Sequence, residues 1–502
     1  YGLEGFLPIL DTLLEVRTPF CRECIVNIIN DRYPRSGEII NGSVYFYHDV
    51  LKLLHNWSFI QTSAVEPASR REVYTAEQMG PLLRYLVVHE IGHTLGLMHN
   101  MRSSYAYPVD SLRSKTFTDE YGTTPSVMDY ARYNYVAQPG DGVTWLLPPR
   151  LGVYDYYAIS WGYKPIYEAA TPEDEKPVLN EWIKSHADDP MYWYGEQEFL
   201  SSVDPAAQTE SLGDDAVKAS EYGMRNLKII MSHLDEWTAK DGENYKYTHE
   251  MYGEVLKQFN RYMGHVMKYI GGNFLLYPVH GDGKQAFEPV TREKQKEALE
   301  FIYTKAAEMP QWLQDPDLLR KFDPTNPLVN DLQAAYVRNL ISAYPKVGYT
   351  SRLADNPYTV EEYIDDIYSL VFAKSIAGKQ LTLSDRNMEY AFVYSVFNYL
   401  GLLESPVSAK GFAADDIFAH GVEAIDDTWP CQHIGCGHAH AEENSLTAAR
   451  KESDIKIQGK AAFYSTLLKI KKVVDKRASS AKGVDKTHYE YLAHEINKGL
   501  AK

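Results

Sequence analysis

The stretch from His89 to His99 constrains this chain more than any other, because it reads H-E-x-x-H-x-x-G-x-x-H. On a helix, His89 and His93 lie one turn apart on the same face, where two imidazoles can share a metal ion. Glu90 is offset by one position, close enough to reach a metal-bound water without being a ligand. Gly96 lets the helix end, since glycine tolerates the left-handed backbone of a helix terminus, and the turned chain can bring His99 back as a third ligand.

Chance does not account for this pattern. The chain has 16 histidines in 502 residues, so a given position is histidine about 3% of the time. H-E-x-x-H alone is expected in roughly one or two per hundred chains of this length, and the glycine and third histidine make coincidence about a thousandfold rarer. The alternative, an amphipathic core helix whose histidines are satisfied by hydrogen bonds, is therefore disfavoured.

A second element follows the motif, where the chain reads Ser-Val-Met-Asp-Tyr and Met128 lies 29 positions after His99. It resembles the methionine-containing turn, or Met-turn, that follows the zinc helix in metzincins. Met128 would place a soft, polarizable thioether under the histidine cluster. Tyr130 matches the tyrosine that astacins and serralysins place near the metal. Alone, Met128 would be interpreted as an ordinary core methionine, but its distance from the motif favours the Met-turn.

With these motifs, the chain resembles bacterial zinc-dependent metalloproteases of the Met-zincin (metzincin) family. The resemblance implies an α+β fold, in which a protease domain with a mixed sheet and the zinc helix precedes a large, mainly α-helical domain. It covers residues 33 to about 400, through the stretches 33–39, 56–57, 59–62, 104–113, 130–139 and 152–155 and, less specifically, 213–216 and 260–265.

The resemblance also implies a zinc-dependent endopeptidase. Bound zinc lowers the pKa of its water to about 7, so that Glu90 could accept a proton as the water attacks a peptide carbonyl, then deliver it to the leaving amine. Tyr130 would be the second catalytic residue and donate a hydrogen bond to the developing oxyanion, while Met128 would be structural. The expected cofactor is Zn²⁺, with three metal ligands: His89, His93 and His99.

Composition bears on partners. The net charge of −17 argues against nucleic acids and anionic membranes, and no apolar run approaches the roughly 18 residues that a membrane span needs. We expect a protein or peptide substrate, no nucleic acid and no membrane span. The chain begins at Tyr1 without a visible signal peptide, so we expect a mature or truncated product. The resemblance implies a secreted, periplasmic or cell-surface location in a bacterium.

Four cysteines form two local pairs, Cys21 with Cys24 and Cys431 with Cys436. Their even number permits two disulfides in an exported protein without establishing them. Residues 431–440 are rich in cysteine and histidine, which makes a second, structural metal site one interpretation. A loop, with or without a disulfide, is the simpler interpretation and the one we favour.

We predict a catalytic domain over residues 1–165, a linker or surface excursion over 166–212 and an α-helical domain over 213–502. Only 88 residues precede His89, and residues 1–24 do not follow the family pattern, so the N-terminal part of the catalytic sheet is expected to be atypical or truncated. A strand is predicted at 25–30, in the position of an edge strand that pairs with substrate, although any buried strand would have this composition. A second strand is predicted at 43–48.

The zinc helix has two predicted starts. Thr75 forms a capping box with Gln78, whereas Pro81 suits a first helical position better than a helix interior. The helix should end near Gly96. Beyond Asp214 the pattern is helical, with apolar residues at i, i+3, i+4 and i+7 from Leu227. These stripes are most simply core, and further helices are predicted after Thr291 through Met309 and at 326–344, 359–378, 384–403, 446–478 and 485–499.

Two other functions stay open. A different zincin would take an acidic third ligand from a later helix, but His99 at the motif spacing argues against this. A catalytically impaired metzincin-like scaffold or peptide-binding protein would keep the motif without a competent sheet. The unusual first 24 residues motivate this second alternative.

Overall fold

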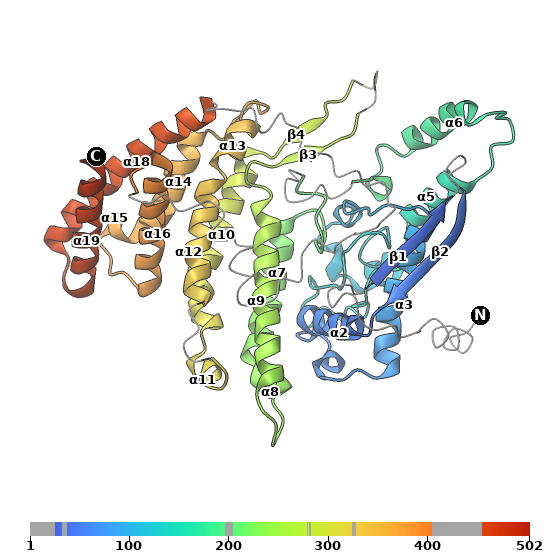
Figure 1. Cartoon of the computed structure of the whole chain (residues 1–502), viewed down its shortest axis with the longest axis horizontal. Coiled ribbons are helices and arrows are strands. Elements are labelled where there is room, and N and C mark those ends of the chain that lie inside the picture. Colours follow the sequence, from blue (N-terminus) through green and yellow to red (C-terminus); the bar gives the residue numbers. More distant parts are fainter. Residues whose placement is uncertain are drawn as a thin grey trace. The chain divides into compact units, whose positions relative to one another are not determined.

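The structure of the chain is a computed structural model, and its helices and strands are labelled in Figure 1. The described residues form two compact units, one comprising those up to 195 together with 206–262, the other comprising 204–205, 263–403 and 454–501. The predicted domain boundaries after residues 165 and 212 stay predictions. The structure describes residues 26–32, 38–195, 204–278, 280, 283–323, 328–403 and 454–501.

Helix α3 (Ala76–Thr94) carries the first two motif histidines and begins at the first predicted start. The Thr75 side chain accepts from the Gln78 backbone, and the Gln78 side chain accepts from the Thr75 backbone, which completes the capping box. Pro81 lies inside the helix.

The predicted end of α3 near Gly96 is also confirmed. Gly96 has a φ of 90°, and its N–H bonds the His93 carbonyl while the Leu97 N–H bonds the Gly92 carbonyl. This pair of bonds is a Schellman motif, which satisfies the last helical carbonyls and reverses the chain. The reversal directs the following residues, including His99, back toward α3.

The core of the first unit lies between α3 and α2 (Asp49–Thr62), a helix that the sequence patterns did not predict. Leu82 and Leu86 of α3 pack with Val50 and Leu54 of α2. Each such side chain contributes about 1.5–3 kcal/mol when it is fully buried. Tyr133 joins this cluster and donates its hydroxyl to the Leu54 carbonyl at 3.1 Å. Helix α3 is therefore held by a packed apolar base.

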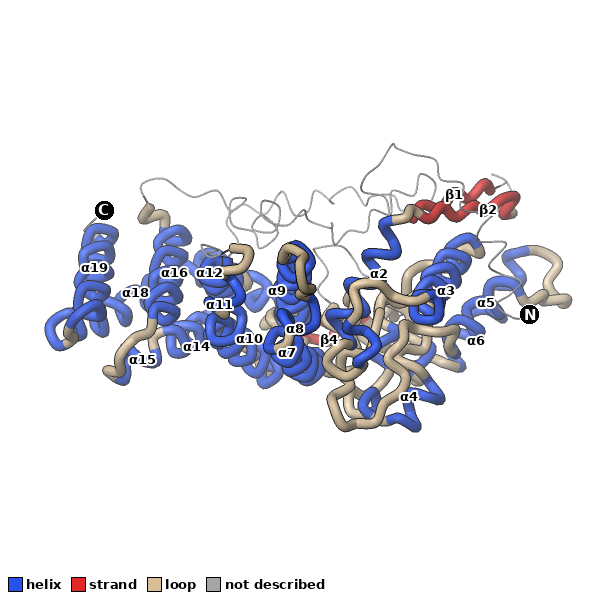
Figure 2. Tube along the Cα trace, turned by 90° about the horizontal axis from the view of Figure 1, so that it is seen from below, coloured by secondary structure: helices blue, strands red, loops and turns tan. Residues whose placement is uncertain are grey.

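Two strands contact the same helix. β1 (Val26–Arg32) and β2 (Ile39–Phe46) pair antiparallel, with Ile28 opposite Val44. They confirm the strands predicted at 25–30 and 43–48, although the pairing of the first with substrate stays a prediction. A second antiparallel pair joins β3 (Asn273–Leu275) to β4 (Phe287–Pro289). The α+β class is confirmed, and the strands within the described ranges form antiparallel pairs in place of the mixed sheet that was expected. Figure 2 shows β1 and β2 in red.

Short helices and loops complete the first unit. Helix α6 lies within the predicted linker or surface excursion and has no buried residue. Part of α9 also belongs to this unit, which holds residues up to 262. The further helical elements are η2 (Pro67–Arg70), η3 (Ser103–Ala106), η4 (Ser111–Arg113), α4 (Lys115–Tyr121), α5 (Val153–Tyr163), α6 (Pro172–Ser185), η5 (Pro190–Tyr192), α7 (Ala216–Ser232), α8 (Leu234–Thr238) and α9 (Lys246–Met267).

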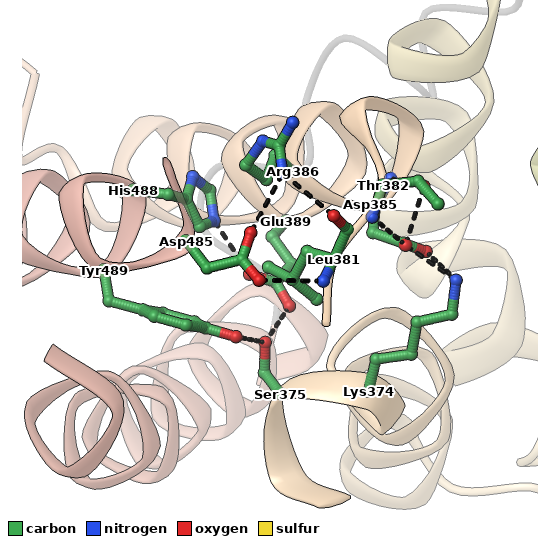
Figure 3. Close-up of polar contacts among 10 residues, drawn as sticks. All are labelled: Lys374, Ser375, Leu381, Thr382, Asp385, Arg386, Glu389, Asp485, His488 and Tyr489. Carbon is green, nitrogen blue, oxygen red and sulfur yellow. Dashed lines mark hydrogen bonds and ion pairs between the residues drawn. The ribbon is translucent and has the colours of Figure 1, made fainter. Parts of the chain in front are cut away.

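The second unit is mainly helical, and the described helices confirm the predicted ones to within a few residues at most ends. A buried polar network joins three of them: Ser375 of α15 and His488 of α19 both bond Glu389 of α16 (Figure 3). The helices are α10 (Arg292–Leu313), α11 (Pro316–Leu319), α12 (Leu328–Ser342), α13 (Tyr344–Thr350), α14 (Val360–Val371), α15 (Ala373–Ala377), α16 (Leu383–Leu400), α18 (Asp454–Ser480) and α19 (Gly483–Leu500).

Two further sequence predictions concern membrane spans and the segments that contain the cysteines. In the described part of the chain, no helix combines the length and the apolar composition that crossing a membrane requires. All four cysteines, the candidate second metal site at 431–440 and the atypical residues 1–24 lie outside the described residues.

Candidate metal centre

The three predicted ligands converge. His89 and His93 lie on α3, and the turn after Gly96 returns His99 to them. One ring nitrogen from each lies within 4.8 Å of the others, and the Nε2 atoms of His93 and His99 are 2.9 Å apart. Of the histidine, cysteine and acidic side chains in the described ranges, these three form the group that could hold a metal ion.

Backbone carbonyls fix the tautomers of the two helical histidines. The Nδ1 of His89 lies 2.8 Å from the Val127 carbonyl oxygen, and the Nδ1 of His93 lies 2.8 Å from that of Leu97. Because a carbonyl can only accept, each Nδ1 carries a hydrogen, and in the neutral ring each Nε2 then keeps its lone pair. Metal-bound histidines are commonly oriented in this way by a bond from the second ring nitrogen.

His89 shows most directly that the residues fit a metal ion. Its side chain is 1% exposed, and its Nε2 has no hydrogen-bond partner among the described residues. A buried polar atom left in this state costs about 1–3 kcal/mol. Burial, with a smaller effect of nearby His93, lowers the pKa of His89 to about 3, so the imidazole is neutral and able to donate its lone pair.

Glu90 lies beside the ligands but is not one of the converging group. Its side chain is 4% exposed, and burial raises its pKa to about 8. A carboxyl in this environment holds a proton firmly at neutral pH, and a neighbouring cation would favour its ionised form. Burial and a nearby cation act in opposite directions, so the pKa of Glu90 can lie near neutral pH, where a general base both accepts and releases a proton.

The segment of the predicted Met-turn lies against α3. Met128 is buried and packs with Tyr85 and Val127 in a small core cluster. A side-chain carbon added at Gly92 would lie 2.4 Å from the Met128 sulfur, so the turn and the helix touch where the helix has no side chain. The structure therefore places a thioether at the helix that carries two of the histidines.

Asp155, at the start of α5, anchors this turn, a role that the sequence patterns did not reveal. Its carboxylate accepts from the backbone N–H groups of Val127 and Gly152, each at 2.8 Å, and from the Ser126 hydroxyl at 2.7 Å. The carbonyl of the same residue, Val127, accepts from His89. Asp155 is therefore linked to His89 through the backbone of a single residue.

Asn100 performs a similar task for His99. Its side chain is buried, donates to the Trp193 carbonyl at 2.9 Å and accepts from the Gly195 N–H at 3.0 Å. Its own N–H donates to the Met128 carbonyl at 3.1 Å. The residue after the third ligand is thus tied to the Met-turn and to a distant loop, and no local signal predicts either partner.

Tyr130 lies next to the cluster. Its ring centroid is 5.0 Å from that of His89 and 4.6 Å from that of His99. The structure therefore brings together every predicted site residue: His89, Glu90, His93, His99, Met128 and Tyr130. Their catalytic and ligand roles stay predictions.

A model of the Met-zincin family matches residues 71–378, which is more than half of the 502 residues. The match contains the three histidines and the Met-turn and continues into the second unit. No curated protein and no solved structure matches the chain.

Proposed function

The chain belongs to the Met-zincin family, and from that premise we propose that it is a zinc-dependent endopeptidase with Glu90 as general base. The observation that carries the proposal is the convergence of three imidazoles beside a buried glutamate. A structural histidine cluster would not need the unpartnered, buried Nε2 of His89. The substrate we propose is a protein or peptide, as the protease family suggests.

His89, His93 and His99 would hold the metal. Zinc is the proposed ion because neutral imidazoles are among its preferred ligands and three of them leave a coordination position open. When bound, zinc supplies Lewis-acid polarisation and a water whose pKa is near 7. The hydrogen bonds of His89 to Val127 and of His93 to Leu97 keep two of the lone pairs directed at the site.

Two protein side chains, Glu90 and Tyr130, would act directly on the reacting groups. Glu90 takes a proton from the attacking water on a carboxylate oxygen and returns it to the leaving amine. The enclosure that raises its pKa also excludes bulk water from the proton exchange. Tyr130, whose ring lies beside His89 and His99, donates its phenolic hydrogen to the oxyanion that develops on the substrate carbonyl.

A metal analysis combined with digestion of casein tests this proposal. We expect about one zinc per chain and casein cleavage that a chelator stops and added zinc restores. A protein that binds zinc at the three histidines and cleaves neither casein nor a mixed peptide library would contradict the endopeptidase and favour the scaffold.

One observation favours the second candidate function, a catalytically impaired scaffold or peptide-binding protein. Ile91 of α3 and Leu95, which follows the last residue of α3, are each 41% exposed, and the described strands that pack against this helix are β1 and β2. An impaired sheet would leave such apolar side chains open to a bound peptide without aligning it for cleavage. Binding of the peptide library without turnover is the outcome specific to this alternative.

A further inference from the structure

Glu210 is distant from Tyr130 in the sequence, yet it bonds the chain both at Tyr130 and at Arg132. Its backbone N–H donates to the Tyr130 carbonyl at 3.0 Å. Its carboxylate, which is 0% exposed, forms an ion pair with the Arg132 guanidinium. The main chain of Glu210 therefore fixes Tyr130, and its side chain fixes the residue two positions later.

The same carboxylate ties this segment to two helices. Its second oxygen lies 3.1 Å from the Arg261 guanidinium of α9 and accepts from the Gln61 side chain of α2 at 3.2 Å. Gln61 in turn accepts from the Tyr133 N–H at 3.0 Å. Arg132 also stacks on the Trp57 ring, 3.2 Å from its centroid. Residues 130–133 are thus held from several directions through Glu210 and Gln61.

The ion pair joins two strained residues. Arg132 has a φ of 49° and Glu210 a φ of 62°, and Tyr277 is the one other non-glycine residue with positive φ in the described part of the chain. The left-handed conformation costs a residue with a side chain roughly 1–2 kcal/mol, and it persists only where the surroundings enforce it. Such strain concentrates at functional sites. Here one partner bonds the backbone carbonyl of Tyr130 and the other lies two residues after Tyr130 in the chain.

We propose that Glu210 is a positioning residue for the reaction, which holds the Tyr130 phenol beside the metal centre through the Tyr130 carbonyl and Arg132. The proposal rests on the proposed peptidase function and on the role of Tyr130 in it. A buried ion pair that served folding alone would affect the stability of the protein and leave the rate of the chemical step unchanged. A positioning role therefore predicts that a Glu210 variant has a lower kcat, whereas a purely structural role predicts an unchanged kcat.

The test compares Glu210→Gln, Tyr130→Phe and the double variant, each loaded with zinc and assayed on a fluorogenic peptide derived from a casein cleavage site. Glu389→Gln is the matched control, because Glu389 is also 0% exposed and bonds two side chains, but in the second unit. Hydrogen exchange of peptides that cover residues 127–135 is measured on the metal-free proteins as a second readout.

We expect Glu210→Gln and Tyr130→Phe each to lower kcat by about tenfold or more with little change in KM, because misplacing a catalytic group by about 1 Å can cost up to about a hundredfold. The double variant should be no slower than Tyr130→Phe alone, because Glu210 acts only through the Tyr130 phenol. Hydrogen exchange over residues 127–135 should be faster in Glu210→Gln than in the wild type. The control Glu389→Gln should keep both the exchange over these residues and the kcat of the wild type.

A folded Glu210→Gln protein with wild-type kcat, or rate losses that multiply in the double variant, would overturn the positioning role. If Glu210→Gln does not fold, Arg132→Lys, which keeps the charge but loses the planar fork, takes its place with the same expectations. If the zinc-loaded wild type cleaves nothing, the peptidase proposal fails separately. The exchange measurement then decides, and unchanged exchange over 127–135 rejects the anchoring by Glu210.

Discussion

At Gly92, the site where a side chain would begin lies 2.4 Å from the sulfur of Met128. The helix that carries the first two histidines and the turn beneath them are therefore in contact, with no space for even a methyl group. A fixed separation between these two elements keeps Val127 within reach of His89.

Gly92→Ala should therefore destabilise the metal-free protein by about 1–3 kcal/mol, since the added methyl must displace Met128 or the helix. Zinc affinity should fall with it. Gly80→Ala is the control, because Gly80 lies on the same helix with nothing within 4 Å of its added carbon, and alanine there should be neutral or stabilising by up to about 1 kcal/mol. Chemical denaturation and zinc titration measure both effects, and equal stabilities of the two variants would refute the contact.

Glu90→Gln should keep zinc and lose peptide hydrolysis, because the amide has no basic oxygen with which to take the proton of the attacking water. His99→Ala should instead lose zinc, and exposed His233→Ala should change neither property. Metal content and cleavage of the same peptide are measured on all three proteins. Substantial turnover by Glu90→Gln would assign the base elsewhere, and full zinc content in His99→Ala would mean that the third ligand is another residue.

Asp155→Ala should weaken zinc binding about 10–100-fold, the usual effect of removing a group that orients a ligand. It leaves the N–H groups of Val127 and Gly152 without their acceptor, which should cost about 1–3 kcal/mol for each that stays buried. Asp155→Asn should recover most of both losses, since one amide oxygen can accept from both N–H groups. Zinc titration and denaturation decide, and no recovery by asparagine would mean that the charge itself matters.

Lys268 should make the stability of the second unit depend on pH. Burial, with a smaller effect of Lys346, lowers the pKa of Lys268 from 10.5 to about 8. Between these values the unfolded chain binds more protons than the folded one, so the free energy of unfolding should rise with pH above about 8. Lys268→Met should remove this rise and be more stable than the wild type at pH 7, by at most about 3 kcal/mol. Exposed Lys379→Met is the control, and identical pH profiles of wild type and Lys268→Met would contradict the prediction.

Local patterns in the chain were enough to locate the zinc helix and most helices of the second unit. The spacing of His89 and His93, the capping pair at Thr75 and the glycine at 96 act within one or two turns of the chain, so they can be interpreted without a fold. Helix α2 was not predicted from the sequence, because its buried face includes polar side chains such as Asn56, Ser58 and Gln61, which interrupt the apolar period.

The anchors of the site depended on the tertiary structure. Asp155 reaches the Met-turn, Asn100 reaches the loop at Trp193, and Glu210 reaches Tyr130 across long separations in the chain. None of these residues belongs to a local pattern, because a hydrogen bond between distant segments leaves no periodic trace in the sequence. The motif thus defined which side chains could bind a metal, while the packing of distant segments decided how those side chains are held, since only folding brings their partners within bonding distance.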